Sequence, residues 1–161
     1  MISAGDKLPE STLVQLGANG PEAVELGPKL RGRKVVIFGL PAAFSGTCSE
    51  AQMPSFIRTK DQFAVKGVDE IICITGNDPF VLDAWGKATG ADKAGITLLS
   101  DAECKHIEAI GMRLDFPPAG LIGRSQRYAM LAEDGVVKLL QREENPGVCD
   151  VSAGESLLDA M

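Results

Sequence analysis

The sequence predicts an α/β fold in which helices flank both faces of a mixed central β-sheet. Two observations support this. Apolar runs within Arg33–Gly39 and Val68–Thr75 are typical of buried strands, and each is followed by a stretch with helical periodicity. Farther along, Glu133-Asp134-Gly135 separates two more apolar stretches, which indicates a β-hairpin. Parallel strands joined by helices, combined with an antiparallel hairpin, give a mixed sheet.

The first half of the chain begins with a region rich in glycine and proline, residues 1–32. The pair Asn19-Gly20 lies between two short apolar pieces there, so we expect a small hairpin. After the strand at Arg33–Gly39, apolar residues at helical spacing predict a helix from Ser49 to Lys66. Pro54 lies inside that helix and should kink it unless the helix restarts there.

The middle of the chain continues the alternation of strands and helices. After the strand Val68–Thr75, Asp78 is a plausible N-cap and Pro79 suits the first helical position. A short strand is expected at Ile96–Leu99, and Asp101 is expected to cap the next helix. These segments extend the β-α-β pattern by a third strand and its helix.

The final part of the chain is predicted to be a loop, a hairpin and a helix. Residues 115–126 contain two adjacent prolines and several glycines, which indicates a loop. Arg127–Ala132 and Val136–Gln141 are the two hairpin strands, and Ser152 should cap a closing helix over Glu155–Met161. This order of elements is the pattern of a thioredoxin-like fold, so we expect one domain spanning residues 1–161.

Composition narrows the classes of function. A net charge of −6 and a pI near 4.8 argue against binding to nucleic acid or to an anionic membrane surface, and no apolar run is long enough to span a bilayer. The four cysteines are widely spaced and there is one histidine, which makes a metal site improbable. Free thiols in a reducing, cytoplasmic compartment are expected instead.

One cysteine lies where a reactive thiolate can form. Cys48 follows a buried strand and a loop of small residues, and it enters the first turn of a predicted helix. Unpaired N–H groups and the positive end of the helix dipole favour an ionised sulfur at such a position. A cysteine after a small-residue loop is, however, more often a buried small hydrophobe than a nucleophile.

The same loop resembles a known family. Pro41, Ser45 and Cys48 have the spacing P-x-x-x-S-x-x-C, which is similar to the signature of peroxiredoxins. Further similarity in Gly67–Val81 and Arg124–Tyr128 is greatest to the atypical peroxiredoxin-5-like, or type II, subfamily. The resemblance covers nearly the whole chain, and it implies a thioredoxin-like thiol peroxidase that acts on hydrogen peroxide and organic hydroperoxides without a cofactor.

The resemblance also implies roles for individual residues. Cys48 would be the peroxidatic cysteine that becomes a sulfenic acid, Ser45 would supply a hydroxyl, and Arg127 would be the catalytic arginine. Pro41, together with Phe44, would keep water away from the sulfur. Because an ordinary thiol is a few per cent ionised near pH 7, full ionisation gains only roughly thirtyfold, and most of the acceleration must come from holding the peroxide.

Three questions stay open at the level of the sequence. The sulfenic acid could be resolved by Cys149 in a glycine- and proline-containing loop, by Cys73 in an apolar strand, or directly by thioredoxin or by glutathione with glutaredoxin. The subfamily usually forms homodimers, and Phe44, Pro79 and Phe80 could provide apolar surface for one. A rival hypothesis is a redox-sensing thioredoxin-like module that is oxidised without catalytic turnover.

Overall fold

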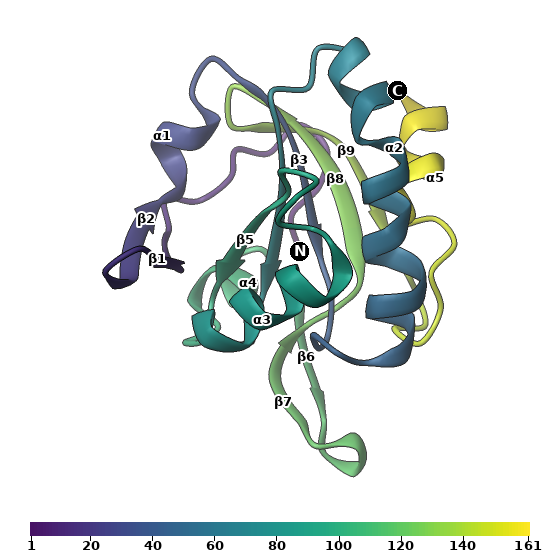
Figure 1. Cartoon of the computed structure of the whole chain (residues 1–161). Coiled ribbons are helices and arrows are strands. Elements are labelled where there is room, and N and C mark those ends of the chain that lie inside the picture. The colour runs from purple at the N-terminus through teal and green to yellow at the C-terminus, as the bar shows by residue number, and fades with distance from the viewer.

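The computed structural model describes all residues from Met1 to Met161, and its centre is a seven-stranded sheet (Figure 1). In chain order its strands are β1 (Thr12–Gly17), β2 (Gly20–Glu25), β3 (Lys34–Gly39), β4 (Glu70–Thr75), β5 (Thr97–Ser100), β8 (Tyr128–Glu133) and β9 (Val136–Arg142). Their order across the sheet is β2-β1-β5-β4-β3-β8-β9. The three central strands β5, β4 and β3 are parallel, whereas β1, β2, β8 and β9 join in antiparallel pairs. The predicted mixed sheet and N-terminal hairpin are confirmed.

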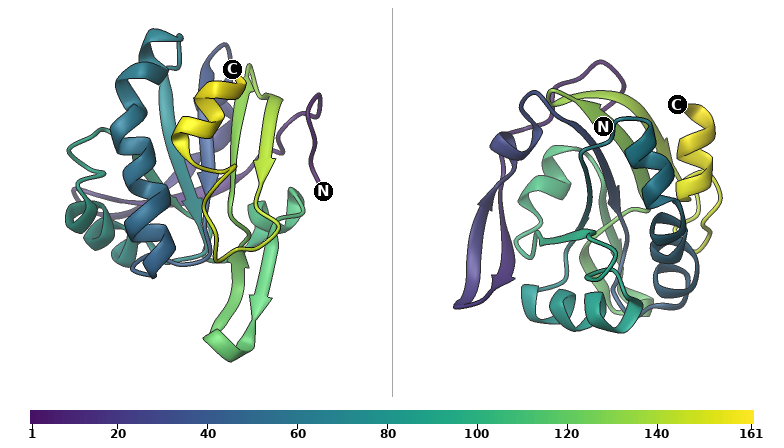
Figure 2. Two further views of the ribbon diagram at one scale, coloured as in Figure 1. Left: turned by 90° about the vertical axis from the view of Figure 1, so that its right-hand side faces the viewer. Right: turned by 45° about the horizontal axis from the view of Figure 1, so that its top comes forward.

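Helices cover both faces of this sheet. They are α1 (Leu26–Leu30), α2 (Met53–Val65), α3 (Pro79–Thr89), α4 (Lys105–Ala109) and α5 (Gly154–Ala160). Helices α2 and α5 lie side by side on one face, which they share with α3, while α1 and α4 lie on the other (Figure 2). None of the helices has both the length and the apolar character needed to cross a bilayer.

The alternation of side chains along the strands divides the interior into two cores. In β3, Val36 and Phe38 pack beneath α2, α3 and α5, whereas Val35 and Ile37 pack beneath α1 and α4. This division follows from the pleat of a strand, which points successive side chains to opposite faces. Both Cys48 and Cys73 belong to the core under α2. The two cysteines therefore share one face of the sheet.

The helix that carries Cys48 begins with an irregular turn. Residues Cys48–Gln52 form a π-helical turn, η1, and α2 follows from Met53 with Pro54 in its first turn. Proline is tolerated in the first turn because its missing N–H would have no acceptor there. The sequence left open a kink or a restart at Pro54; in the structure the π turn passes directly into α2, with Gln52 in helical conformation at the junction.

The prediction of a loop over residues 115–126 is wrong in one respect. Residues 115–126 mostly belong to a second, two-stranded sheet of β6 (Arg113–Phe116) and β7 (Leu121–Ser125), which projects from the body (Figure 1). The prolines do not interrupt the strands, because they form the 3-10 turn η2 (Pro117–Ala119) between them. Gly120 closes that turn at φ +73°, a conformation that favours glycine.

Two predicted helix caps also need correction. The residue before α5 is Ala153, and the Ser152 hydroxyl donates to Glu143 instead of capping the helix. Helix α4 begins only at Lys105, although the Asp101 carboxylate accepts from the N–H of Ile107 at 2.8 Å, inside that helix. In contrast, Asp78 caps α3 as expected by accepting from the N–H of Val81 at 2.9 Å.

Candidate active site

Cys48 lies at the end of the sheet where β3 leaves the core. The loop that joins β3 to η1 turns sharply, with Phe44 at φ +64° and the Ser45 hydroxyl donating to the carbonyl of Ala42 at 2.7 Å. Cys48 is the first residue of η1 and has no exposed surface. Its backbone N–H has no acceptor among the hydrogen bonds of the protein, so this donor is available beside the sulfur.

Arg127 reaches the sulfur from the neighbouring strand. Gly39 pairs with Tyr128, so the residue before β8 is brought beside the loop that follows β3. The Nη2 atom of Arg127 lies 3.2 Å from the Sγ atom of Cys48, although 79 positions separate the two residues. Arg127 is only 2% exposed, and a buried guanidinium favours a negative charge on the sulfur that it contacts. The predicted pair is therefore in direct contact.

The other nitrogens of Arg127 are occupied as well. Its Nη1 atom donates to the Gln52 side-chain oxygen at 2.8 Å, and its Nε atom donates to the Pro146 carbonyl at 3.0 Å. Gln52 is fully buried, and its amide nitrogen donates to the carbonyl of Tyr128 at 3.2 Å. Gln52 is not among the site residues that the sequence predicts. Its position four residues after Cys48 was the available signal, because residues at that spacing share a helix face.

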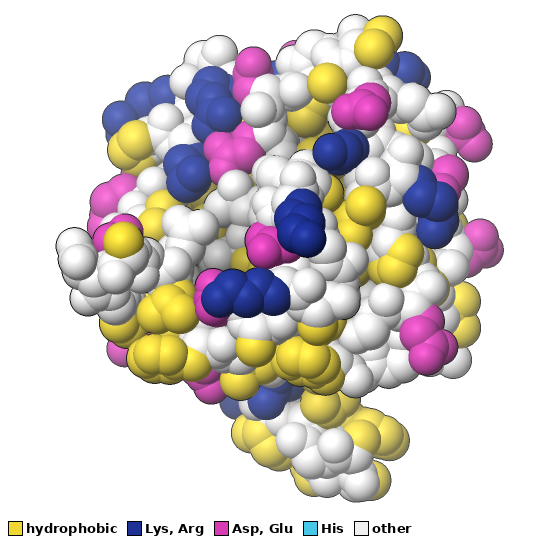
Figure 3. Space-filling view, in the orientation of Figure 1, with side chains coloured by type: hydrophobic (Ala, Val, Ile, Leu, Met, Phe, Trp, Pro, Cys, Tyr) yellow, Lys and Arg dark blue, Asp and Glu magenta, His cyan; other side chains and the backbone are white.

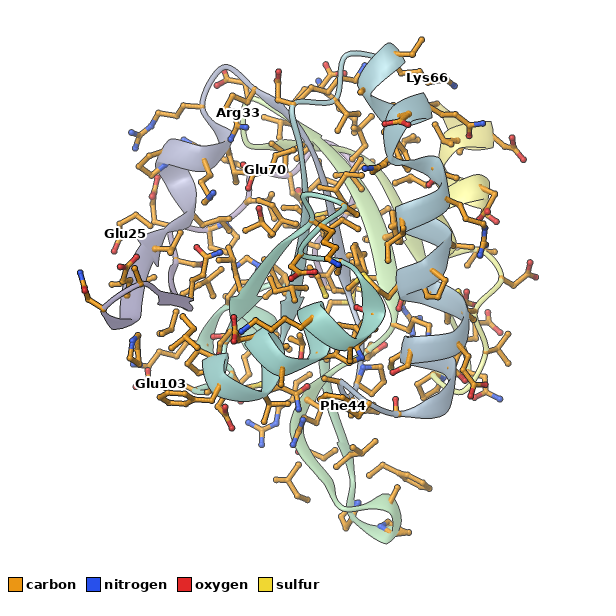
Figure 4. The ribbon with its side chains drawn as sticks, viewed as in Figure 1. Glu25, Arg33, Phe44, Lys66, Glu70 and Glu103 are labelled. Atoms are coloured by element: carbon orange, nitrogen blue, oxygen red, sulfur yellow. The ribbon has the colours of Figure 1, made fainter.

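The other predicted site residues, Pro41, Ser45 and Phe44, differ in how far they are buried. Pro41 is buried next to the site, and Ser45 is partly buried with its proton committed to Ala42. The Ser45 lone pairs therefore remain to accept a hydrogen bond from a substrate. Phe44, which was expected to exclude water and also to offer apolar surface, is 57% exposed at the tip of the loop (Figure 4).

A pocket of about 620 Å³ opens beside this group. One wall is Pro41, Ser45 and Arg127, another is the β6–β7 hairpin, and a third is residues 145–147. The hairpin contributes the apolar side chains of Leu114, Phe116 and Leu121. The pocket therefore combines an apolar wall with a guanidinium and a hydroxyl, and Cys48 is in contact with Arg127, one of its lining residues.

Residues 144–151 form a loop, called the strap below, and part of it lines the pocket. The Thr47 hydroxyl donates to the Gly147 carbonyl at 2.9 Å, close to the Arg127–Pro146 hydrogen bond. Below the strap, the Glu143 carboxylate accepts from the N–H groups of Asp150 and Ser152. Partial burial alone would raise the pKa of Glu143, but these N–H donors outweigh it and lower the pKa below its usual value. The strap is thus anchored by a carboxylate.

The two candidate resolving cysteines lie in different surroundings. Cys149 is carried by the strap and is partly exposed, and partial burial is the main cause of its raised pKa. Cys73 lies in β4 without exposed surface, and complete burial raises the pKa of its thiol well above the usual value. Cys149 therefore lies in a partly exposed surface segment, whereas Cys73 lies in the central sheet, in the same core as Cys48.

Comparisons with known proteins agree with this geometry. The redoxin family model matches residues 3–158. The chain is 42% identical to rice peroxiredoxin-2E-2, chloroplastic, over 99% of this chain and 72% of the rice protein, and 36% identical to Arabidopsis peroxiredoxin-2D over 99% and 98%.

Solved structures show the same relationship. Reduced Prx3 of Vibrio vulnificus in complex with H₂O₂ superposes with a TM-score of 0.92 at 41% identity, covering 99% of each chain. Peroxiredoxin 5 of Alvinella pompejana superposes with a TM-score of 0.83 at 28% identity, covering 99% of this chain and 97% of that one. These matches confirm the predicted thioredoxin-like fold and the resemblance to the peroxiredoxin-5-like, type II group. The chain therefore belongs to the redoxin family and, within it, to the peroxiredoxins, which are thiol-dependent peroxidases.

Proposed function

We propose that this peroxiredoxin reduces hydrogen peroxide and organic hydroperoxides through the Cys48 thiolate. The sulfur attacks the distal peroxide oxygen, an S–O bond forms and the O–O bond breaks. The other oxygen leaves as hydroxide or alkoxide and takes up a proton, and Cys48 becomes a sulfenic acid. The observation that carries this proposal is the 3.2 Å contact between Arg127 Nη2 and Cys48 Sγ in a water-poor site.

The surrounding groups have separate roles in this reaction. Arg127 stabilises the thiolate and donates to the oxygen on which negative charge develops. The free N–H of Cys48 is a second donor, and the lone pairs of the Ser45 hydroxyl accept a hydrogen bond from the peroxide. Pro41 closes the apolar side of the site. The solved structure of reduced Prx3 from Vibrio vulnificus in complex with H₂O₂ supports hydrogen peroxide as a substrate.

Mass spectrometry of peroxide-treated protein tests the assignment of Cys48. With one equivalent of hydrogen peroxide and a reagent that traps sulfenic acids, we expect the label on the peptide that contains Cys48. Its sulfur is the one in contact with a guanidinium. Labelling of Cys73, Cys104 or Cys149 with Cys48 unmodified would contradict the proposal.

Cys149 is the proposed internal partner of the sulfenic acid. Two residues before Cys149, Gly147 accepts a hydrogen bond from Thr47 of the catalytic loop, whereas Cys73 lies in a central strand. Without the trapping reagent, we expect a disulfide between Cys48 and Cys149 that thioredoxin, or glutaredoxin with glutathione, then reduces. Turnover of a Cys149→Ser protein at the wild-type rate would contradict this step and leave the external thiol as the direct resolver.

Catalytic turnover separates the peroxidase from a redox-sensing module. A sensor is oxidised once per molecule, whereas a peroxidase consumes many equivalents of peroxide while thiol reductant lasts. The family relationship favours the peroxidase. We also propose a reducing compartment such as the cytoplasm, since all four cysteines are unpaired.

A homodimer is proposed through the apolar surface around the site. Phe44, Phe80, Phe116 and Ile122 are each more than half exposed, and Figure 3 shows hydrophobic side chains along the lower edge and the projecting hairpin. Exposed apolar surface of this kind marks interaction sites. We expect sedimentation analysis to find a dimer, and Phe80→Glu to shift the protein to the monomer. A Val65→Glu protein, altered at an exposed residue on α2, is the matched control.

A further inference from the structure

The first part of the catalytic loop, Pro41–Ser45, is tied to the rest of the fold by a single hydrogen bond. Within Pro41–Ser45, the other hydrogen bonds join loop residues to one another or to the helical turn that follows. The exception is the N–H of Ala43, which donates to the Asn77 side-chain oxygen at 2.9 Å. The next residue, Phe44, has a left-handed backbone at φ +64°, which side-chain-bearing residues rarely adopt. Such a conformation persists only where its surroundings hold it.

Asn77 is itself held firmly at the ends of two strands. The Thr75 hydroxyl donates to the Asn77 side-chain oxygen at 2.7 Å and accepts from the Asn77 N–H at 3.0 Å. The Ser100 hydroxyl donates to the Asn77 carbonyl at 2.6 Å. Thr75 and Ser100 are the last residues of β4 and β5, and they face each other in the sheet register. The side-chain oxygen of Asn77 is therefore a fixed point at the carboxyl edge of the sheet.

The backbone before Asn77 passes close to the pocket hairpin. A Cβ atom added to Gly76 would lie 2.6 Å from the Gly123 carbonyl of β7, so glycine allows the two segments to approach closely. Asn77 thus lies in a closely packed connection that contacts the catalytic loop through Ala43 and the pocket hairpin through Gly76. Arg127 is positioned separately, because its partners are Cys48, Gln52 and Pro146.

We infer that Asn77 is a positioning residue for the peroxide, acting through Ala43 on the Ser45 hydroxyl and the Cys48 N–H. This inference rests on the proposed function of Cys48. It separates two requirements of the reaction. The Arg127 contact places a cation beside the sulfur, and the Asn77 contact shapes the loop that holds the peroxide in line with the sulfur.

The test compares two reagents that attack the same sulfur. Iodoacetamide measures the reactivity of the Cys48 thiolate, whereas hydrogen peroxide also requires the shaped loop. For Asn77→Ala, we expect the ratio of the peroxide to the iodoacetamide rate constant to fall tenfold or more. The pH profile of alkylation should stay as in the wild type, because Arg127 keeps its contacts. An unchanged ratio would overturn the inference, including the case in which both rate constants fall by the same factor.

Three further variants separate positioning from general damage. Asn77→Asp keeps the acceptor oxygen and should restore the ratio to within about threefold of the wild type. Asp78→Ala removes the neighbouring helix cap without touching Ala43, so it should lower the melting temperature and leave the ratio unchanged. If Asn77→Ala does not fold, Thr75→Val removes the hydroxyl that orients the amide and should lower the ratio in the same direction.

Failure of the inference can be distinguished from failure of the proposed function. Peroxide consumption by a Cys48→Ser protein at the wild-type rate would show that the assignment of Cys48 is wrong. An inactive Cys48→Ser protein together with an unchanged ratio in Asn77→Ala would overturn the role of Asn77 alone.

Discussion

Replacing Cys48 with serine should lower thiol-dependent peroxide consumption to the uncatalysed rate, a loss of at least about 10³-fold. A serine hydroxyl does not ionise near neutral pH, so the guanidinium of Arg127 would face a neutral and weakly nucleophilic oxygen. The measurement is initial peroxide consumption with an excess of dithiol. Circular dichroism should show an unchanged fold, since serine is slightly smaller than cysteine.

The matched control for this variant is Cys104→Ser. Cys104 is also buried, but it lies on the opposite face of the sheet, just before α4. We expect Cys104→Ser to retain wild-type activity with some loss of thermal stability. Equal loss of activity in the two variants would mean that folding, and not the identity of the nucleophile, limits the Cys48→Ser protein.

Replacing Arg127 with glutamine should lower kcat/KM for hydrogen peroxide by about 10²–10³-fold. Glutamine lacks the positive charge, and its shorter side chain cannot donate to Cys48, Gln52 and Pro146 together. We also expect alkylation of Cys48 at neutral pH to slow, because the thiolate loses its cationic partner. Stopped-flow kinetics of peroxide reduction and the alkylation rate at neutral pH are the two measurements.

Two further arginine variants divide charge from geometry. Arg127→Lys keeps the charge but not the planar fork, so alkylation should recover more than peroxide reduction does. Arg58→Gln removes an exposed surface ion pair with Glu155 and should leave both rates unchanged. If Arg127→Gln reduced peroxide as fast as Arg58→Gln, the guanidinium would have no role in the reaction.

The strands were predictable because their signals are local and strong. Apolar runs mark β3 and β4, and Glu133-Asp134-Gly135 marks the turn between β8 and β9. The error at residues 115–126 has the same origin. The prolines and glycines there do mark a turn, but the sequence does not reveal that short flanking strands pair with each other outside the main sheet.

The site was predictable only in part. The spacing of Pro41, Ser45 and Cys48 identifies the loop, but Arg127 was singled out by family resemblance and not by its local sequence. Its contact with Cys48 depends on the pairing of β3 with β8, which is long-range information. Asn77 depends in the same way on three segments that meet at the end of the sheet. Hydrogen bonds of this kind leave no periodic pattern in a sequence.

The complete burial of Cys48 has a consequence for regeneration of the enzyme. A peroxide is far smaller than a redox protein such as thioredoxin, which presents its own sulfur on a broad surface. For such a partner to reach the buried sulfur, we expect the Thr47–Gly147 hydrogen bond to break and the π turn to unwind. Raising the concentration of that partner should therefore bring turnover to a plateau, and the height of the plateau would report how often the site opens.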